Sequence, residues 1–330
     1  MSARVSTRRR SSICWGSALL GIPDFPAAFR PSPACRVLGV GIATLDLINE
    51  VDCYPSEDSE VRALSQRRVR GGNVANSLSV LAQLGHQCTW LGTLADDAAS
   101  QEVLLDLEHH GIDATAAVTV PGAMTPTSYV TLSRVSGSRT IVHHRDLPEL
   151  DAAGFEALSL KGVQWVHFEG RNPAETASMI QSARRRAPQA VISLELEKPR
   201  PGIEALLAGP HLIIAGRAYA QARGFEDPGA FLRDLERQTT AGLCVLGWGA
   251  GGAYLRARGG CVEHAGAHAP AQVVDTLGAG DCLNAAVIDG LLRALTPREA
   301  VVRAVRLAGL KCGRIGLDGL VAEARRTGWF

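Results

Sequence analysis

A glycine-rich turn that carries a carboxylate is the stretch of this sequence best suited to chemistry. It reads Val273-Val-Asp-Thr-Leu-Gly-Ala-Gly-Asp281, and an apolar helical pattern follows it over residues 282–292. Gly278 and Gly280 allow positive φ angles and let bare backbone N–H groups come close to a ligand. Because these amides would stand at the positive end of a helix dipole, they predict an anion hole suited to a phosphoryl group.

Asp281 adds a carboxylate beside this predicted anion hole. A phosphate repels a carboxylate, so the acid needs another function, and a general base that accepts a hydroxyl proton is one. A helix-capping aspartate is the simpler interpretation of an isolated Gly-x-Gly-Asp, but the full run favours phosphoryl transfer. We therefore expect Asp281 to act as the base and the backbone amides of Gly278, Ala279 and Gly280 to stabilise the transferring group.

A pair of asparagines forms a second candidate site. Gly71-Gly72-Asn73 opens a predicted helix over 74–84, and Asn73 and Asn76 share one face at its start. Amide side chains both donate and accept hydrogen bonds, which suits the neighbouring hydroxyls of a sugar. Asp46, which follows the first predicted strand, would fix such hydroxyls through charge-assisted hydrogen bonds. From spacing alone, a capping asparagine beside a solvated one is the simpler interpretation of the pair.

The elements that must position these residues alternate between short apolar runs and helical patterns. This alternation predicts a parallel sheet covered by helices on both faces. Ligands bind beyond the carboxyl ends of the strands in such sheets, so Asp46 and Asp281 should lie at one edge. Strands are predicted over 37–40, 88–92, 163–168, 190–196, 211–215 and 243–246, and helices over 74–84, 98–110, 174–186, 229–237 and 297–312.

Two stretches, about 44–70 and 117–143, interrupt the alternation. They lack a helical period, are rich in Val, Thr, Ile and Tyr, and contain turn signals such as Ser136-Gly137-Ser138. We predict that they form antiparallel strands inserted into the α/β unit. Ordinary edge hairpins packed on the core are the alternative.

The run from Asp275 to Asp281 resembles the signature of the ribokinase-like family of sugar and nucleoside kinases. Further blocks, spread over roughly residues 36–321, together resemble the ketohexokinases (fructokinases) of animals. These blocks are Glu57-Asp-Ser-Glu-Val-Arg62, Leu64-Ser-Gln-Arg67, Arg70-Gly-Gly-Asn73, Arg139-Thr-Ile-Val142, Glu169-Gly-Arg-Asn172, Glu197-Lys-Pro-Arg200 and Lys311-Cys-Gly313.

The resemblance implies one ribokinase-like, three-layer α/β/α kinase domain over residues 35–330. The segments about 44–70 and 117–143 would then form a small antiparallel β lid, or β-clasp, over the sugar site. Closing such a lid excludes water, which would compete with the sugar as phosphoryl acceptor. The same lid would clasp a second copy of the chain in a homodimer, with Asp58 reaching the neighbouring active site.

The resemblance also implies roles for single residues. The cofactors would be ATP, Mg²⁺ and K⁺, with the monovalent cation near Asp275 and Thr276. Sugar-binding residues would be Asp46, Gly72, Asn73, Asn76 and Asp281. Nucleotide-binding residues would be Arg139, Gly252, Ala253, Gly278, Gly280 and Cys312.

Three departures from the family pattern concern the nucleotide side. Ala250 and Gly251 stand where an acidic residue is expected, and Gly216-Arg-Ala-Tyr219 replaces an Asn-x-x-Glu motif that is associated with magnesium. Mg²⁺ would therefore be held mostly by ATP and through water. Cys282-Leu283 replaces the usual Thr-Phe, which we expect to be a tolerated packing change.

Composition excludes several other classes of protein. A net charge of +1 and a pI near 7.7 give no electrostatic reason to bind nucleic acid or acidic membranes. No apolar run reaches the roughly 20 residues that a membrane span needs. The eight cysteines contain no C-x-x-C pair, which argues against zinc and disulfides and favours reduced thiols in a cytoplasmic enzyme. His143-His144 lacks further metal ligands at usable spacing.

Residues 1–34 differ from the rest because they are rich in arginine and contain one acid, Asp24. A mitochondrial presequence has this composition. A start codon assigned too early is the alternative that we favour, because lysine occurs only at 161, 198 and 311 while arginine and alanine abound. In either case we expect the segment to be disordered.

The leading hypothesis is a kinase that phosphorylates a ketohexose with ATP, most simply D-fructose to fructose 1-phosphate. Within the same fold, the rivals are kinases for fructose C6, ribose or a keto-deoxy sugar acid. A catalytically weak regulator that binds nucleotide or sugar is a rival of another class. A nicotinamide dehydrogenase is set aside, because no Gly-x-Gly-x-x-Gly follows the first predicted strand.

Overall fold

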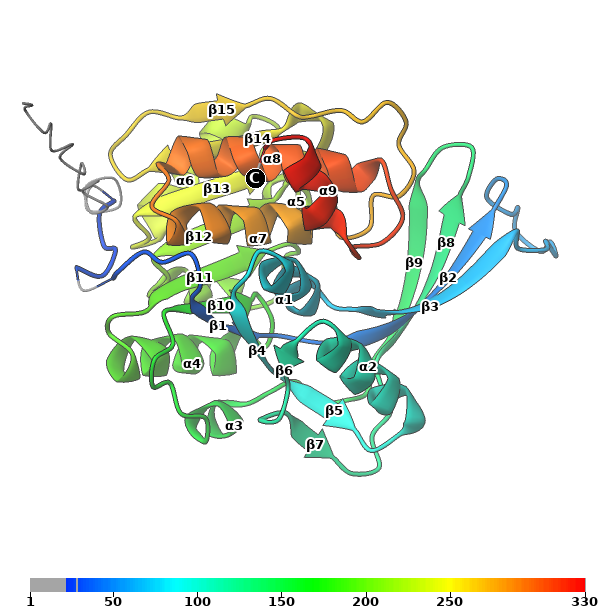
Figure 1. Ribbon diagram of the computed structural model, residues 1–330, viewed down its shortest axis with the longest axis horizontal. Helices are drawn as coiled ribbons and strands as arrows, with labels where there is room; N and C mark the ends of the chain where they lie inside the picture. Colours follow the sequence, from blue (N-terminus) through cyan, green and yellow to red (C-terminus); the bar gives the residue numbers. More distant parts are fainter. Residues whose placement is uncertain (1–21, 28, 330) are drawn as a thin grey trace, which may run out of the picture.

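A large twisted sheet forms the centre of the computed structural model, which describes residues 22–27 and 29–329 (Figure 1). Within this part of the chain the sheet has nine strands in the order β15-β14-β13-β12-β11-β10-β1-β4-β6. The strands from β6 to β13 are parallel, and β14 and β15 add an antiparallel edge. Their bounds are β1 Arg36–Val40, β4 Gln87–Leu91, β6 Ile112–Asp113, β10 Trp165–Glu169, β11 Val191–Leu196, β12 Leu212–Gly216, β13 Leu243–Gly247, β14 Ala253–Ala257 and β15 Glu263–Ala265.

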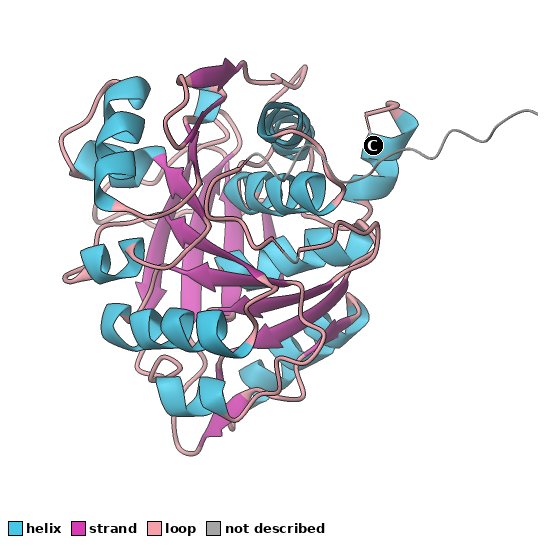
Figure 2. Ribbon diagram, turned by 90° about the vertical axis from the view of Figure 1, so that its left-hand side faces the viewer, coloured by secondary structure: helices cyan, strands magenta, loops and turns pink. Residues whose placement is uncertain are grey.

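Helices cover both faces of this sheet, as Figure 2 shows. Alternate residues of a strand face opposite layers: Val37 of β1 packs in one apolar core, and Leu38 packs in the other. The first core is covered by α1 Asn73–Gln83, α2 Ala98–His109, α7 Ala279–Leu292, α8 Pro297–Cys312 and α9 Leu320–Arg326. The second is covered by α3 Ala152–Glu156, α4 Pro173–Arg186, α5 Arg217–Ala222 and α6 Pro228–Gln238, with the 3₁₀ turn η2 Ile203–Leu207.

The predicted strands and helices all occur with ends shifted by at most two residues, except that α7 begins at Ala279, three residues before the predicted start. Hydrophobic periodicity explains this agreement, because both faces of the parallel strands are buried and each amphipathic helix packs on one of them. Among the described residues no helix is long and apolar enough to cross a membrane.

A smaller sheet projects from one side of the body, at the right of Figure 1. In the described chain it has four strands in the order β3-β2-β8-β9. They are β2 Thr44–Val51, β3 Ser65–Gly71, β8 Thr127–Ser133 and β9 Arg139–His144. We call these four strands the lid sheet.

The prediction that the inserted strands are purely antiparallel is wrong for the lid sheet. The hairpins β2–β3 and β8–β9 are antiparallel, but β2 and β8 pair in parallel. The reason is topological: the two hairpins come from distant parts of the chain, and both enter from the body in the same direction. In addition, residues 118–120 form β7, which pairs with β5 Thr93–Ala95 outside the lid sheet.

The described residues before the first strand pack against the body. Phe29 is buried and meets Trp165 edge to face at 6.3 Å. Ser32 N–H donates to the carbonyl of Leu292 at 2.9 Å. The expectation of disorder is therefore wrong for the described residues 22–27 and 29–34, because Ile22 and Phe29 anchor them in the apolar core of the body. Residues 1–21 lie outside the described part of the chain, so the choice between a presequence and an early start codon stays a prediction.

Candidate active site

A cavity of about 580 Å³ lies between the lid sheet and the carboxyl ends of the central strands. Residues after β1, β10 and β11 line it together with residues of β2, β3, β8 and β9. The cavity brings together candidates that are far apart in the sequence: Asp46, Gly72, Asn73, Asn76, Arg139, Asp275, Thr276, Gly278, Gly280 and Asp281.

Gly278 of the glycine-rich turn has the positive φ that the sequence allows, whereas Gly280 is not among the positive-φ glycines of the described chain and lies in the first turn of α7. Gly278 has φ 77° and is followed by the first residue of α7, Ala279. Apart from its chain neighbours and the backbone of its own helix, a Cβ built on Gly280 would meet no atom of the described chain within 4 Å, so the space beside it is open. The first amides of an α-helix have no carbonyl partner within the helix. The start of α7 can therefore offer N–H donors to an anion in the cavity.

The carboxyl group of Asp281 is only 6% exposed, and Asn76 is its neighbour. Asn76 Nδ2 donates to Asp281 Oδ2 at 2.7 Å. This bond joins the start of α1 to the start of α7. The sequence spacing of Asn73 and Asn76 predicted a shared helix face, but it did not predict that one amide would hold the candidate base.

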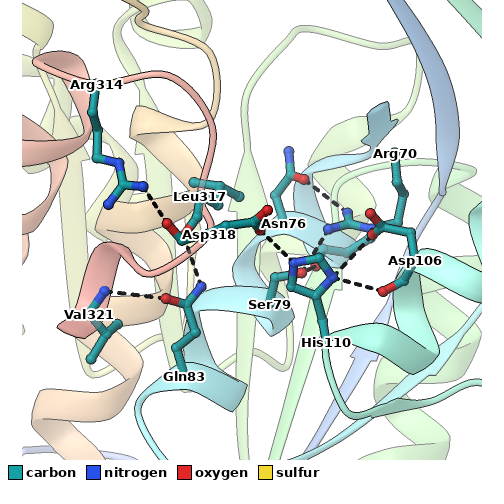
Figure 3. A network of polar contacts seen from close by, with 11 residues as sticks. Arg70, Asn76, Ser79, Gln83, Asp106, His110, Arg314, Leu317, Asp318 and Val321 are labelled. Carbon is teal, nitrogen blue, oxygen red and sulfur yellow. Dashed lines mark hydrogen bonds and ion pairs between the residues drawn. The ribbon is translucent and has the colours of Figure 1, made fainter. Parts of the chain in front are cut away.

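Arg70 of β3 fixes the orientation of the Asn76 amide. Its Nη1 donates to Asn76 Oδ1 at 2.9 Å, which turns the NH₂ group of Asn76 toward Asp281. The same guanidinium donates to Ser79 Oγ at 2.7 Å and to Asp106 Oδ1 at 2.5 Å (Figure 3). Three separate acceptors therefore fix this planar group.

His110 continues this network across the rim of the cavity. Its Nδ1 lies 3.3 Å from Asp106 Oδ1, and its Nε2 lies 2.9 Å from Asp318 Oδ1 (Figure 3). Hydrogen bonds to Asp106, followed by the bond to Asp318, raise the pKa of His110 to about 9. The imidazolium thus links the end of α2 to the segment before α9 at neutral pH.

Acidic side chains crowd around Asp281. Its pKa is raised to about 8: burial is the main cause, the charges of Glu197 and Glu169 also raise it, and the hydrogen bond from Asn76 opposes them. Burial and the neighbouring carboxylates, Asp281 first, also raise the pKa of Glu195 well above its ordinary value. A carboxylate with a raised pKa is a stronger base, which suits the abstraction of a hydroxyl proton.

The other sugar-binding candidates, Asp46, Gly72 and Asn73, also line the cavity. Asp46 of β2 accepts from Thr44 Oγ1 at 2.8 Å, and burial raises its pKa against hydrogen bonds from Thr44 and Ser128. Asn73 Nδ2 donates to Glu197 Oε2 at 3.1 Å. Gly72 has φ 104°, and a Cβ there would lie 2.2 Å from the carbonyl oxygen of Ile42. Close backbone contact therefore requires glycine at this position.

Of the nucleotide-binding candidates, Arg139 lies in the cavity, where its Nη1 donates to Thr276 Oγ1 at 2.8 Å. Gly252, Ala253 and Cys312 are not among the described residues that line the cavity. Gly252 has a packing reason to be glycine, because a Cβ there would lie 2.1 Å from the carbonyl oxygen of Ala265. The carbonyl of Cys312 accepts from Val274 N–H at 2.8 Å.

Two further candidates differ from what was expected: one does not line the cavity, and the other has a lysine beside it. Asp58 is exposed in the connection between β2 and β3, with φ 56°, and is not among the described lining residues. The position near Asp275 and Thr276, where a monovalent cation was expected, holds the ammonium of Lys311, 2.8 Å from the carbonyl oxygen of Asp275.

Several residues of the site could not be recognised individually from the sequence. Arg70, Glu195 and Lys311 line the cavity, yet no spacing rule marks them, because each reaches it from a different element. Arg70 and Lys311 did lie within the blocks that carry the family resemblance. Such blocks are the available signal when the contacts are formed only by the tertiary structure.

Residues 36–323 match the sequence profile of the pfkB family carbohydrate kinases. The chain belongs to this family. Mouse ketohexokinase is 37% identical to it over 294 residues, which cover 87% of this chain and 99% of that protein. The protein is therefore a sugar kinase, a phosphotransferase, and the predicted family resemblance is confirmed.

Solved structures confirm the ribokinase-like fold. Ribokinase from Giardia lamblia superposes with a TM-score of 0.75 at 16% identity, over 89% of this chain and 99% of that chain. Ribokinase from Arabidopsis thaliana, solved in complex with ribose and ATP, gives a TM-score of 0.71 at 20% identity, over 86% and 94% of the two chains. At these identities the comparisons show the fold alone.

Replacing Arg70 with Ala should lower kcat by about 10²-fold, because a freed Asn76 amide misplaces the base. The apparent pKa of the kcat/KM profile should also rise, since Asn76 and Arg70 both lower the pKa of Asp281. Arg68→Ala is the matched control, because Arg68 stands on the same strand with a half-exposed side chain paired to Glu102. An Arg70→Ala enzyme with unchanged kcat and pH profile would contradict the positioning role.

Asp281→Asn should raise the thermal stability of the kinase in a pH-dependent way. The folded protein keeps the Asp281 proton up to about pH 8, whereas an ordinary aspartate has a pKa of 3.8, so ionisation costs stability as pH rises between these values. The neutral amide avoids this cost. Melting temperatures across this range should therefore diverge in favour of the variant, and a gap that does not grow with pH would contradict the raised pKa.

Proposed function

We propose that this kinase transfers the γ-phosphoryl group of ATP to O1 of a ketohexose, most simply D-fructose, to give fructose 1-phosphate. The observation that carries the proposal is the buried Asp281 carboxyl group, which lies in the first turn of α7 and is bonded to Asn76 in one cavity. The relationship to mouse ketohexokinase, over nearly the whole of that protein, supports the choice of sugar.

In this mechanism the sugar lies between the lid sheet and the start of α1. Asp46, Asn73 and Asn76 offer carboxylate and amide groups to its hydroxyls. In its ionised form Asp281 accepts the proton of the reacting hydroxyl as the phosphoryl group arrives, so turnover requires that Asp281 first lose its own proton. The amides at the start of α7 stabilise the charge on the phosphoryl oxygens, because they need no reorientation during the reaction. Arg139 stands where it can bind the phosphates of the nucleotide.

Magnesium fits the acidic wall of this cavity. Glu195 accepts from Asn284 through Oε1 at 2.9 Å, whereas its buried Oε2 has no hydrogen-bond partner among the described residues. An unpaired carboxylate oxygen suits Mg²⁺, which prefers oxygen ligands and usually arrives with the phosphates. Bound with ATP, the ion neutralises charge on the nucleotide. The described residues contain no cluster of three His, Cys, Asp or Glu side chains arranged to hold a metal.

A cytoplasmic enzyme is consistent with the cysteines. The described cysteines are all free thiols, and several are buried in the core. Disulfides are rare in cytosolic proteins, where thiols stay reduced.

The function is tested with a coupled assay for ADP release against a panel of ketoses and aldoses, with phosphorus NMR of the product. D-fructose should give the highest kcat/KM, with phosphate on C1. Asp281→Asn, which keeps the volume of the side chain, should still bind sugar and ATP but turn over roughly 10² to 10⁴ times more slowly. Phosphate on C6 of the product, or a higher kcat/KM for an aldose, would show that the protein is a different sugar kinase. Binding without turnover in the unsubstituted enzyme would favour a regulator.

We further propose a homodimer formed through the lid sheet. On the face turned away from the cavity the lid sheet has exposed apolar side chains, among them the cross-strand neighbours Tyr129 and Val142. The strand β9 is exposed along its whole length, and bare strand edges favour association. Asp58, which stands outside the cavity of its own subunit, would then reach the partner's cavity in a two-fold arrangement.

Mixed dimers test whether Asp58 acts at the active site of the partner subunit. Asp58→Ala and Asp281→Asn subunits, carrying different tags, are co-expressed and the heterodimer is purified. If Asp58 acts across the interface, one site is intact and the other has both defects, so about half of the normal activity should return, as two-fold symmetry requires. If Asp58 acts within its own subunit, each site has one defect and activity stays low. A monomer in light scattering would exclude the dimer itself.

A further inference from the structure

The carboxyl group of Asp275 is buried directly before the anion hole, and it is paired with a buried lysine. Asp275 is 2% exposed and Lys311, in the last turn of α8, is 1% exposed. Lys311 Nζ donates to the carbonyl oxygen of Asp275 at 2.8 Å and lies 3.3 Å from Asp275 Oδ2. It also donates to the carbonyl oxygen of Arg314 at 3.3 Å.

These contacts surround the ammonium with oxygens, two through hydrogen bonds to backbone carbonyls and one through an ion pair with the carboxylate. A lysine has three N–H donors, and three oxygens surround Nζ: two backbone carbonyls and one carboxylate oxygen. Carbonyl oxygens of this kind are also the groups that replace water around K⁺ in proteins. The oxygens that would bind a free monovalent cation beside Asp275 therefore already surround a positive charge that is covalently attached to the chain.

A second cation would be repelled from this position. Lys311 Nζ is in contact with both the carbonyl and the carboxylate of Asp275, and Arg67 Nη2 approaches Asp275 Oδ2 to 3.9 Å from the lid sheet. Two positive groups thus face one buried carboxylate, and a third charge would meet repulsion at short range. The residues near Asp275 and Thr276 do not fit the potassium ion that the family resemblance implied.

Lys311 also fixes the turn that carries the anion hole. Asp275 Oδ1 accepts from the N–H of Leu277 at 2.9 Å, so the carboxylate closes the turn directly before Gly278. The N–H of Gly316 approaches Asp275 Oδ2 at 3.5 Å from the segment after α8. A buried ammonium on Asp275 therefore holds this turn in place and adds a positive field beside the amides of α7.

We propose that the Lys311 ammonium is a built-in monovalent cation for the anion hole, so that the kinase works without potassium. This inference rests on the proposed phosphoryl transfer at the start of α7. Lys311 acts as a positioning residue: it orders the turn from Asp275 to Gly278 and contributes its charge at the place where a free ion would otherwise be required.

The first experiment compares rates in potassium, sodium and choline chloride at one ionic strength. The unsubstituted kinase should turn over equally in all three salts. Lys311→Ala should lose about 10²-fold in kcat in choline chloride, as expected when an electrostatic contribution to the anion hole is removed. Potassium or ammonium ions should restore a large part of this loss, because the vacated oxygens can then bind a free cation. Lys161→Ala, at an exposed lysine, is the matched control and should change nothing.

Thermal unfolding gives a readout that does not depend on catalysis. Potassium should raise the melting temperature of Lys311→Ala in a saturable way, since a bound ion stabilises the folded state, and should leave the unsubstituted kinase unchanged. This result would stand even if the enzyme phosphorylates none of the sugars, so the two proposals fail separately.

Three results would overturn the inference. One is a saturable increase in rate or melting temperature when potassium is added to the unsubstituted kinase, a measurement that needs no variant to fold. Another is a Lys311→Ala enzyme with normal kcat in choline chloride. The third is a slow, folded Lys311→Ala enzyme that neither potassium nor ammonium activates or stabilises.

Discussion

The buried hydrogen bond between Asn76 and Asp281 is the contact on which the site depends. It joins the start of α1 to the start of α7, two helices that pack on the same face of the central sheet. A carboxylate at this depth is unfavourable unless it is neutral or hydrogen-bonded. The surrounding structure supplies both conditions, with an amide held by Arg70 and a pKa raised by burial and neighbouring acids. The fold thus tolerates an unfavourable group at the point where the proposed mechanism needs a base.

Much of the body could be predicted because its signals are local. Strands such as β11, buried on both faces, and amphipathic helices such as α6 leave a period in the sequence that needs no knowledge of their partners. The turn before α7 was predictable for a similar reason, since glycine spacing fixes its backbone directly. These features depend on neighbours along the chain.

The remaining features depend on groups that meet only after folding. Nothing near Arg70 in the sequence indicates that its guanidinium orients an amide that in turn holds a carboxylate on α7. The parallel pairing of β2 with β8 was missed because each hairpin taken alone predicts antiparallel strands. Phe29 lies in an arginine-rich segment whose composition suggested disorder, yet its ring is covered by Trp165. In each case a tertiary contact outweighed the local pattern.

The lid sheet carries groups that face both ends of the cavity. Asp46 stands on β2 and Arg139 on β9, whereas Asp281 is anchored in a helix that is buried from that residue to its end. Any rigid displacement of the sheet therefore moves Asp46 and Arg139 together, while Asp281 stays still. In the proposed mechanism these two residues bind the sugar and the phosphates, so the binding free energy of either ligand would be linked to that of the other, and the linkage would be reciprocal.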